Sequence, residues 1–139
     1  MEQAYQSLTV RAERQGLLEI TREIAAWLAE QKVREGLLTV FIRHTSASIL
    51  IQENVDPDVQ RDMEAFFLAL VPESDADYRH CAEGPDDMPA HIKGALTQTH
   101  LSIPVSAGRM MLGRYQGIFL FEHRRRPRPR ELVLHLIGG

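Results

Sequence analysis

The sequence contains a single cysteine, Cys81, among 139 residues. One cysteine excludes a disulfide within the chain, and it also excludes a zinc site built from paired cysteines. No stretch approaches the roughly 18 consecutive apolar residues of a membrane span, and no basic segment followed by an apolar one opens the chain. We therefore expect a cytoplasmic protein that does not enter a membrane.

The 9 glycines form neither a Walker loop nor a dinucleotide-binding turn. The chain also lacks a basic excess, because 16 Lys and Arg residues stand against 19 Asp and Glu residues. This balance argues against general nucleic-acid binding. The acidic residues are concentrated, since residues 53–87 hold 11 of them and only 2 basic residues. Such a segment is typical either of a cation site or of a solvated helix and loop.

A hydrophobic content of 44% indicates one globular domain spanning residues 1–139, with a core that needs no disulfide or metal. Short runs rich in β-forming residues predict strands over residues 4–10, 37–42, 48–52, 101–105, 109–112, 117–123 and 131–137. The arginine-rich segment 124–130 would then be a solvated hairpin loop or, in a sharper interpretation, an anchor for phosphate.

Three helices complete the prediction. Apolar residues at helical spacing predict the first over residues 19–33. Asp56 followed by Pro57 predicts the start of the second. We expect that helix to bury Met63, Phe66, Phe67 and Leu70. Asp86, Asp87 and Pro89 predict the start of a third, shorter helix. The fold class is therefore α+β, with helices packed on a largely antiparallel sheet.

Histidines are the most informative residues, because four of the 6 lie in polar settings, namely His44, His80, His91 and His123. Three imidazoles from separate elements, with one coordination position left open, would make a Lewis-acid metal site. Their separations along the chain match no local ligand spacing. On spacing alone, each one is therefore better explained as a histidine that is hydrogen-bonded at the end of a strand.

Carboxylates and hydroxyls near these histidines have two interpretations each. Asp86 and Asp87 are explained by helix capping, or one of them binds a cation or accepts a proton. The hydroxyls of Thr45, Ser46 and Ser48 could bind a phosphate, although Ser and Thr between two strands usually form turns.

Five segments are recognisable as motifs: HTSASILIQEN, DPDVQRDM, EGPDDMPAHIKGAL, YQGIFLFEHR and ELVLHLIGG. Their order and spacing resemble the YjbQ family over essentially the whole chain. The resemblance implies a compact α+β sandwich of sheet and helices and a homotrimer. It also implies a polar site that holds a metal ion or an anion, and a weak, secondary thiamine-phosphate synthase activity.

By resemblance, the motif histidines of the family fall on His44, His91 and His123, which form the predicted metal triad. His80 is the alternative ligand. By the same resemblance, polar motif positions fall on Asn54, Asp62, Asp86, Asp87 and Gln116, and we expect Asn54, Asp86 and Asp87 to be catalytic. With the three hydroxyls named above, the predicted substrate- or anion-binding residues are Thr45, Ser46, Ser48, Asp62, His80 and Gln116. Two departures from the family pattern are a tyrosine, Tyr115, in place of tryptophan, and the long arginine-rich segment 124–130.

Three functions follow from these residues. The first is thiamine-phosphate synthesis, in which a bound divalent metal polarises phosphate oxygens. The second is metal-dependent hydrolysis of a small phosphorylated or acyl substrate. The third is non-catalytic binding of a metal or small anion by a trimer. Histidine ligands favour zinc, whereas magnesium, the usual partner of a departing pyrophosphate, prefers oxygen ligands.

Overall fold

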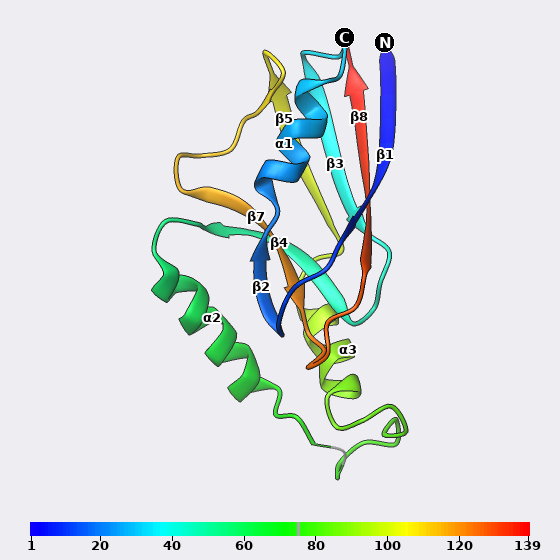
Figure 1. Cartoon of the computed structure of the whole chain (residues 1–139), viewed down its shortest axis with the longest axis vertical. Coiled ribbons are helices and arrows are strands. Elements are labelled where there is room, and N and C mark those ends of the chain that lie inside the picture. The colour runs from blue at the N-terminus through cyan, green and yellow to red at the C-terminus, as the bar shows by residue number, and fades with distance from the viewer. Residues whose placement is uncertain (75) are drawn as a thin grey trace.

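The computed structural model, shown in Figure 1, describes residues 1–74 and 76–139. Within that part of the chain, eight strands and three helices follow one another in this order: β1 (Glu2–Val10), β2 (Gly16–Glu19), α1 (Thr21–Ala29), β3 (Gly36–Ile42), β4 (Ala47–Glu53), α2 (Pro57–Leu70), α3 (Asp87–Leu96), β5 (His100–Ser106), β6 (Arg109–Met110), β7 (Gln116–Glu122) and β8 (Arg130–Gly138). Every predicted strand is present, with ends shifted by at most two residues.

The strands form two antiparallel sheets, one with the order β1-β8-β3-β5-β6 and one with the order β2-β7-β4. The α+β class with largely antiparallel strands is therefore confirmed. The main hydrophobic core lies between the sheets and α1. Strand β8 shows how alternation builds this core, because Leu132, Leu134 and Leu136 are buried at every second position. The residues between them are more exposed.

Strand β7 is buried on both faces, which explains its continuous apolar run. Ile118 and Leu120 point into the main core between the sheets. Phe119 and Phe121 point the other way, where Phe121 packs edge-on against Phe67 of α2 with ring centroids 5.4 Å apart. The strand is therefore the shared wall of two hydrophobic clusters.

Helix α1 is shorter than the predicted helix over residues 19–33. At its start, the predicted range overlaps β2, an edge strand paired with β7, by Glu19 alone. At its other end, α1 stops at Ala29, four residues before the predicted end. The helical residues keep the predicted inward face, because Ile24 and Leu28 are both buried.

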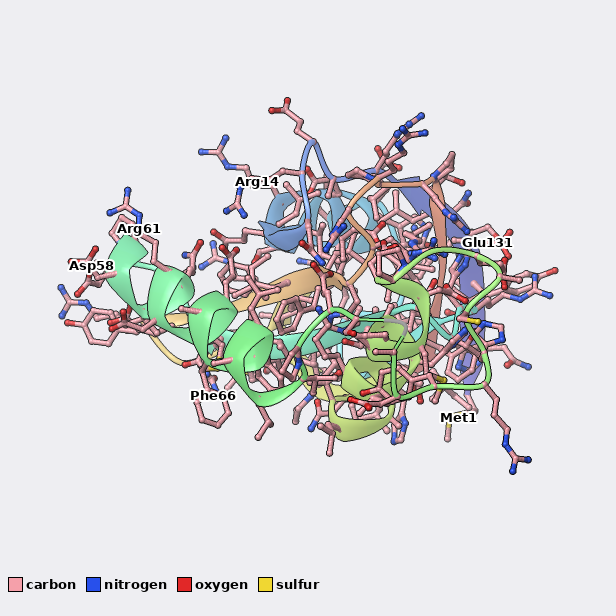
Figure 2. All side chains as sticks on the ribbon, turned by 90° about the horizontal axis from the view of Figure 1, so that it is seen from below. Met1, Arg14, Asp58, Arg61, Phe66 and Glu131 are labelled. Carbon is pink, nitrogen blue, oxygen red and sulfur yellow. The ribbon has the colours of Figure 1, made fainter. Side chains whose placement is uncertain are left out.

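Helix α2 begins as predicted, because the side chain of Asp56 accepts a hydrogen bond from the backbone N–H of Asp58 at 2.9 Å. The expected burial of its apolar face is confirmed for Met63 and Phe67, which are partly buried against Phe119 and Phe121, and wrong in the single chain for the other two residues. Phe66 and Leu70 are 59% and 54% exposed. Figure 1 shows α2 running along the outside of the smaller sheet, and Figure 2 shows Phe66 projecting outward from it.

The segment 124–130 is not a hairpin loop, because it leaves β7 in the smaller sheet and enters β8 in the larger one. The two sheets are joined at this point by a buried ion pair. Arg130 donates from Nε to Glu122 Oε1 at 2.9 Å and from Nη2 to Glu122 Oε2 at 2.5 Å. Both side chains are almost completely buried. Such a fork geometry fixes how the end of β7 lies against the start of β8.

None of the helices in the described part of the chain has the length and apolar character that crossing a membrane would require.

Replacing Arg130 with Met leaves the buried Glu122 carboxylate without its counter-ion. We expect the free energy of unfolding to fall by about 3–5 kcal/mol, the usual cost of breaking one side of a buried pair. Chemical denaturation of purified protein measures this directly. Arg126→Met, at an exposed arginine of the same segment, should stay within about 0.5 kcal/mol of the parent. An equal loss in both variants would contradict this role for the pair.

Candidate functional site

The acidic start of α3 is buried, and capping does not explain it. Asp86 occupies the capping position, yet its side chain makes no capping hydrogen bond. Asp86 and Asp87 are only 7% and 2% exposed. Buried carboxylates need positively charged or hydrogen-bonding partners. The capping interpretation of Asp86 is therefore wrong, and the partners come from the far end of β7.

Arg124 supplies those partners with a single guanidinium. Its Nε donates to Asp86 Oδ2 at 2.9 Å, and its Nη1 donates to Asp87 Oδ1 at 2.5 Å. Its Nη2 donates to the carbonyl oxygen of Glu83 at 2.9 Å. The guanidinium thus fixes both carboxylates and the loop that precedes them. The sequence prediction of a solvated arginine loop missed this residue.

Both carboxylates stay ionised despite their burial. Burial acts to raise the pKa of Asp87, but the hydrogen bond from His80 and the charge of Arg124 outweigh it and hold this pKa below its usual value. For Asp86, burial is likewise outweighed by the backbone N–H of Arg125 and by Arg124, so its pKa is also lowered. The site therefore presents negative charge.

Asp87 brings two histidines together. Its Oδ2 lies 2.5 Å from His80 Nε2 and 3.2 Å from His91 Nε2. In the described residues, one atom each from His80, Asp87 and His91 lie within 4.8 Å of one another, a spacing at which a metal ion could be held. We call these three residues the HDH cluster. His80 was the alternative ligand of the sequence analysis.

The backbone sets the tautomer of His91. Its Nδ1 lies 3.1 Å from the carbonyl oxygen of Thr45, which can only accept, so Nδ1 carries a hydrogen. In the neutral ring, Nε2 then presents a lone pair toward Asp87 Oδ2. A nitrogen lone pair and a carboxylate oxygen 3.2 Å apart repel each other unless a proton or a cation lies between them. A carbonyl behind a histidine is also the usual support of a metal-bound imidazole.

The structure does not assemble the predicted triad, since only His91 of its three histidines belongs to the HDH cluster. His44 accepts a hydrogen bond at Nε2 from the backbone N–H of Glu131 at 2.8 Å. Burial and the charge of Arg130 lower the pKa of His44. A neutral imidazole whose Nε2 is already occupied is a poor metal ligand at that nitrogen.

His123 is completely buried, away from the HDH cluster. Its Nε2 is hydrogen-bonded to Ser48 Oγ at 2.8 Å, and Thr97 Oγ1 donates to the same hydroxyl at 2.6 Å. Its Nδ1 has no partner among the described residues. Burial, followed by the charges of Lys93 and Arg130, lowers the pKa of His123 to about 3. Ser48, a predicted anion ligand, is committed to this buried network.

Two adjoining hollows share lining residues, and the smaller one reaches the HDH cluster at His91. The larger, about 680 Å³, runs between the end of β3 and the residues that precede β8. The smaller, about 280 Å³, is lined by His91 and the middle of α3. His44, Thr45 and Thr99 line both. We call the larger hollow the arginine cleft, since Arg43, Arg128 and Arg130 line it. Ser46 also borders the cleft, though its side chain is buried.

Three predicted site residues lie elsewhere. Asn54, beyond the far end of β4, donates to Glu19 Oε2 at 2.9 Å. The side-chain oxygen of Gln116 accepts from the backbone N–H of Gly113 at 2.7 Å. Asp62 is exposed on α2. The structure does not bring these residues to the HDH cluster within one chain.

The sequence analysis missed the two buried arginines, although a signal for them exists. Strand β7 is apolar up to Phe121 and then places Glu122 at its end. A carboxylate at the end of a strand that is buried on both faces needs a buried cation nearby. The arginine-rich segment directly after it supplies Arg124 and Arg130.

The buried His123 should make the protein sensitive to acid. The unfolded chain takes up a proton at this histidine near pH 6.5, whereas the folded chain does so only near pH 3. The free energy of unfolding therefore decreases as pH falls between these values, by up to about 1.4 kcal/mol per pH unit. We expect His123→Phe to reduce this slope clearly between pH 6.5 and about 4.5 in denaturation experiments, and the part that remains belongs to His44, whose pKa is also lowered. An unchanged slope would mean that His123 is not the responsible group.

Comparison with known proteins adds to this geometry. The family model described as "UPF0047 protein YjbQ-like" matches residues 6–139. A UPF0047 protein of Synechocystis sp. is 50% identical over 94% of this chain and 89% of its own. The UPF0047 protein YjbQ of Escherichia coli O157:H7 is 44% identical over 95% of this chain and 96% of its own. A solved structure of a conserved hypothetical protein from Thermus thermophilus superposes with a TM-score of 0.85 at 35% identity, covering 95% of this chain and 99% of that one. The chain therefore belongs to the UPF0047 protein YjbQ-like family.

Proposed function

We propose that the HDH cluster binds a divalent metal ion, with zinc preferred, and that the protein hydrolyses a small phosphorylated molecule. One observation carries the proposal. The tautomer imposed on His91 by the Thr45 carbonyl directs Nε2 at Asp87 Oδ2, 3.2 Å away. Two ligands about 2.0–2.1 Å from a tetrahedral zinc ion lie roughly 3.3 Å apart, so the spacing of His91 and Asp87 matches such a pair. His80 Nε2, 2.5 Å from the same oxygen, is at hydrogen-bonding distance and would have to move away from that oxygen to bind the ion.

The donor set decides between zinc and magnesium. Two imidazole nitrogens and one carboxylate oxygen are a ligand set that zinc uses in catalytic sites, with a further position left open. Magnesium prefers six oxygen ligands and would find only one here. When bound, zinc would polarise a phosphate oxygen and lower the pKa of a water molecule.

The chain's own residues would hold and orient the reacting groups. Arg124 keeps Asp87 ionised and fixes the direction of its free oxygen, which is a positioning role. Glu83 Oε2 lies 3.3 Å from His80 Nε2 and is accessible to solvent, so this carboxylate could accept a proton at the edge of the site. We place the phosphate of the substrate in the arginine cleft, which carries positive charge and adjoins the smaller hollow that His91 lines.

Thiamine-phosphate synthesis is a weaker candidate at the same site. One observation favours it, since the two adjoining hollows of about 680 and 280 Å³ offer room for two substrates. The HDH cluster supplies only one carboxylate oxygen for the magnesium that a departing pyrophosphate usually needs. The reaction would therefore be slow, in keeping with a secondary activity.

We also propose that the protein is a homotrimer, which the exposed apolar side chains of α2 support. Phe66, Leu68 and Leu70 are 59%, 43% and 54% exposed in the single chain. Sedimentation equilibrium should give three times the chain mass of 15.8 kDa. Replacing Phe66 with Ser should weaken the assembly, because the interface would lose a large apolar side chain. A monomer at micromolar concentration would contradict the trimer.

Metal binding and turnover test the function together. Tag-free protein treated with chelator should take up about one zinc ion per chain and then release inorganic phosphate from a simple aryl phosphate. His91→Ala should lose both properties, because it removes one of the cluster's two imidazoles. His100→Ala is the matched control, since this exposed histidine lies on β5 outside the cluster. It should retain both.

The remaining outcomes separate the competing functions. Stoichiometric zinc without turnover of any phosphate ester would overturn the hydrolase and leave a binding module. Turnover only when a second, acceptor substrate is present would favour the synthase. Protein that binds no zinc, in the parent as in His91→Ala, would overturn the metal site itself.

A further inference from the structure

Two N–H groups that have no acceptor among the described residues face each other at the floor of the arginine cleft. Arg130 uses Nε and Nη2 to bind Glu122, and Nη2 also donates to the carbonyl of Ser46 at 3.2 Å. Its third nitrogen, Nη1, has only one polar atom within hydrogen-bonding distance among the described residues, the Nδ1 atom of His44 at 3.4 Å. The direction of hydrogen bonding at His44 decides what this contact is.

The other nitrogen of His44 settles that direction. Nε2 lies 2.8 Å from the backbone nitrogen of Glu131, which can only donate. Nε2 must therefore accept, and in the neutral ring the hydrogen is on Nδ1. Burial and the neighbouring charge of Arg130 lower the pKa of His44, in agreement with a neutral ring. The contact at 3.4 Å thus joins two donors, and it is not a hydrogen bond between them.

We infer that His44 Nδ1 and Arg130 Nη1 together bind one oxygen of an oxyanion, with a phosphate group as the expected ligand. A single oxygen placed between two converging donors would satisfy both, as in other anion sites built from fixed N–H groups. Arg130 is 2% exposed and anchored by Glu122, so its Nη1 is held in place before any ligand arrives. The site is preorganised, which lowers the entropic cost of binding.

The walls of the cleft fit an anion. Its lining residues include three arginines and a histidine but no carboxylate. Arg43 is partly neutralised by Glu131, 2.7 Å away. Arg128 is exposed at the rim, and its guanidinium has no hydrogen-bond or salt-bridge partner among the described residues. The hydroxyls of Thr45 and Thr99 add neutral donors. Positive charge therefore remains available at the rim, above the two buried donors.

The position of this oxyanion site relates it to the HDH cluster. His44 and Thr45 line both hollows, and His91 lines the smaller one. A molecule whose phosphate lies at His44 could therefore extend toward His91. The statement that this oxyanion site holds the phosphate end of a substrate rests on the proposed function. Binding of the anion itself needs no metal. His44 is accordingly an anion-binding residue here and not the metal ligand of the sequence prediction.

The tautomer of His44 gives the first test. Long-range ¹H–¹⁵N NMR spectra of the native protein near pH 7, recorded with chelator present, distinguish a hydrogen on Nδ1 from one on Nε2. We expect the Nδ1–H form, and we expect inorganic phosphate to shift its resonance. An Nε2–H tautomer would overturn the inference, because the contact with Arg130 would then be an ordinary hydrogen bond.

Binding of inorganic phosphate to the metal-free protein gives the second test, by calorimetric titration in chelator. His44→Phe keeps a ring but removes the donor, and it should weaken binding at least about tenfold. Arg128→Gln should weaken binding about two- to fivefold and flatten its dependence on salt. Arg126→Gln, at an exposed arginine that does not line the cleft, should change nothing.

The outcomes keep this inference separate from the proposed function. Phosphate binding that is lost in His44→Phe but kept in His91→Ala supports the oxyanion site whether or not zinc binds. Phosphate binding that is equal in the parent and in His44→Phe would overturn it. Binding that appears only after zinc is added would overturn it as well and place the anion on the metal.

Discussion

Two arginines at the ends of one segment hold this structure together. Arg124 leaves β7 and binds the carboxylates at the start of α3. Arg130 opens β8 and binds Glu122 at the end of β7. All of these side chains are nearly inaccessible to water. The seven-residue segment 124–130 therefore joins the two sheets and ties α3 to both. Removing either arginine would leave a buried carboxylate without a partner.

The two buried ion pairs also decide which polar atoms are left free to bind a ligand. Because Arg124 occupies Asp87 Oδ1, only Oδ2 is directed at His80 and His91. Because Glu122 occupies two nitrogens of Arg130, only Nη1 is left facing His44. The proposed cation site and the proposed oxyanion site consequently lie on either side of Thr45. Its carbonyl orients His91, and the residue itself lines both hollows.

Local patterns in the sequence predicted most of the fold. Alternation and apolar runs located every strand except β2, and Asp56 with Pro57 located the start of α2. Strand β2, residues 16–19, was not predicted, because its pairing with β7 is a long-range contact that the spacing of residues does not reveal. For the site, the residues of the HDH cluster were all named, but His44 and His123 were grouped with His91 by motif. Their burial and the groups that occupy their nitrogens depend on distant residues, such as Glu131 and Ser48.

X-ray absorption spectroscopy at the zinc edge, on protein loaded with one equivalent of zinc, tests the central claim most directly. The account predicts two imidazole nitrogens and one carboxylate oxygen at about 2.0–2.2 Å, with a fourth light-atom ligand from solvent. Replacing His80 or His91 should remove one imidazole contribution, and replacing His44 should remove none. A site with three imidazoles, one of them lost in His44→Phe, would contradict the account and restore a triad that includes His44.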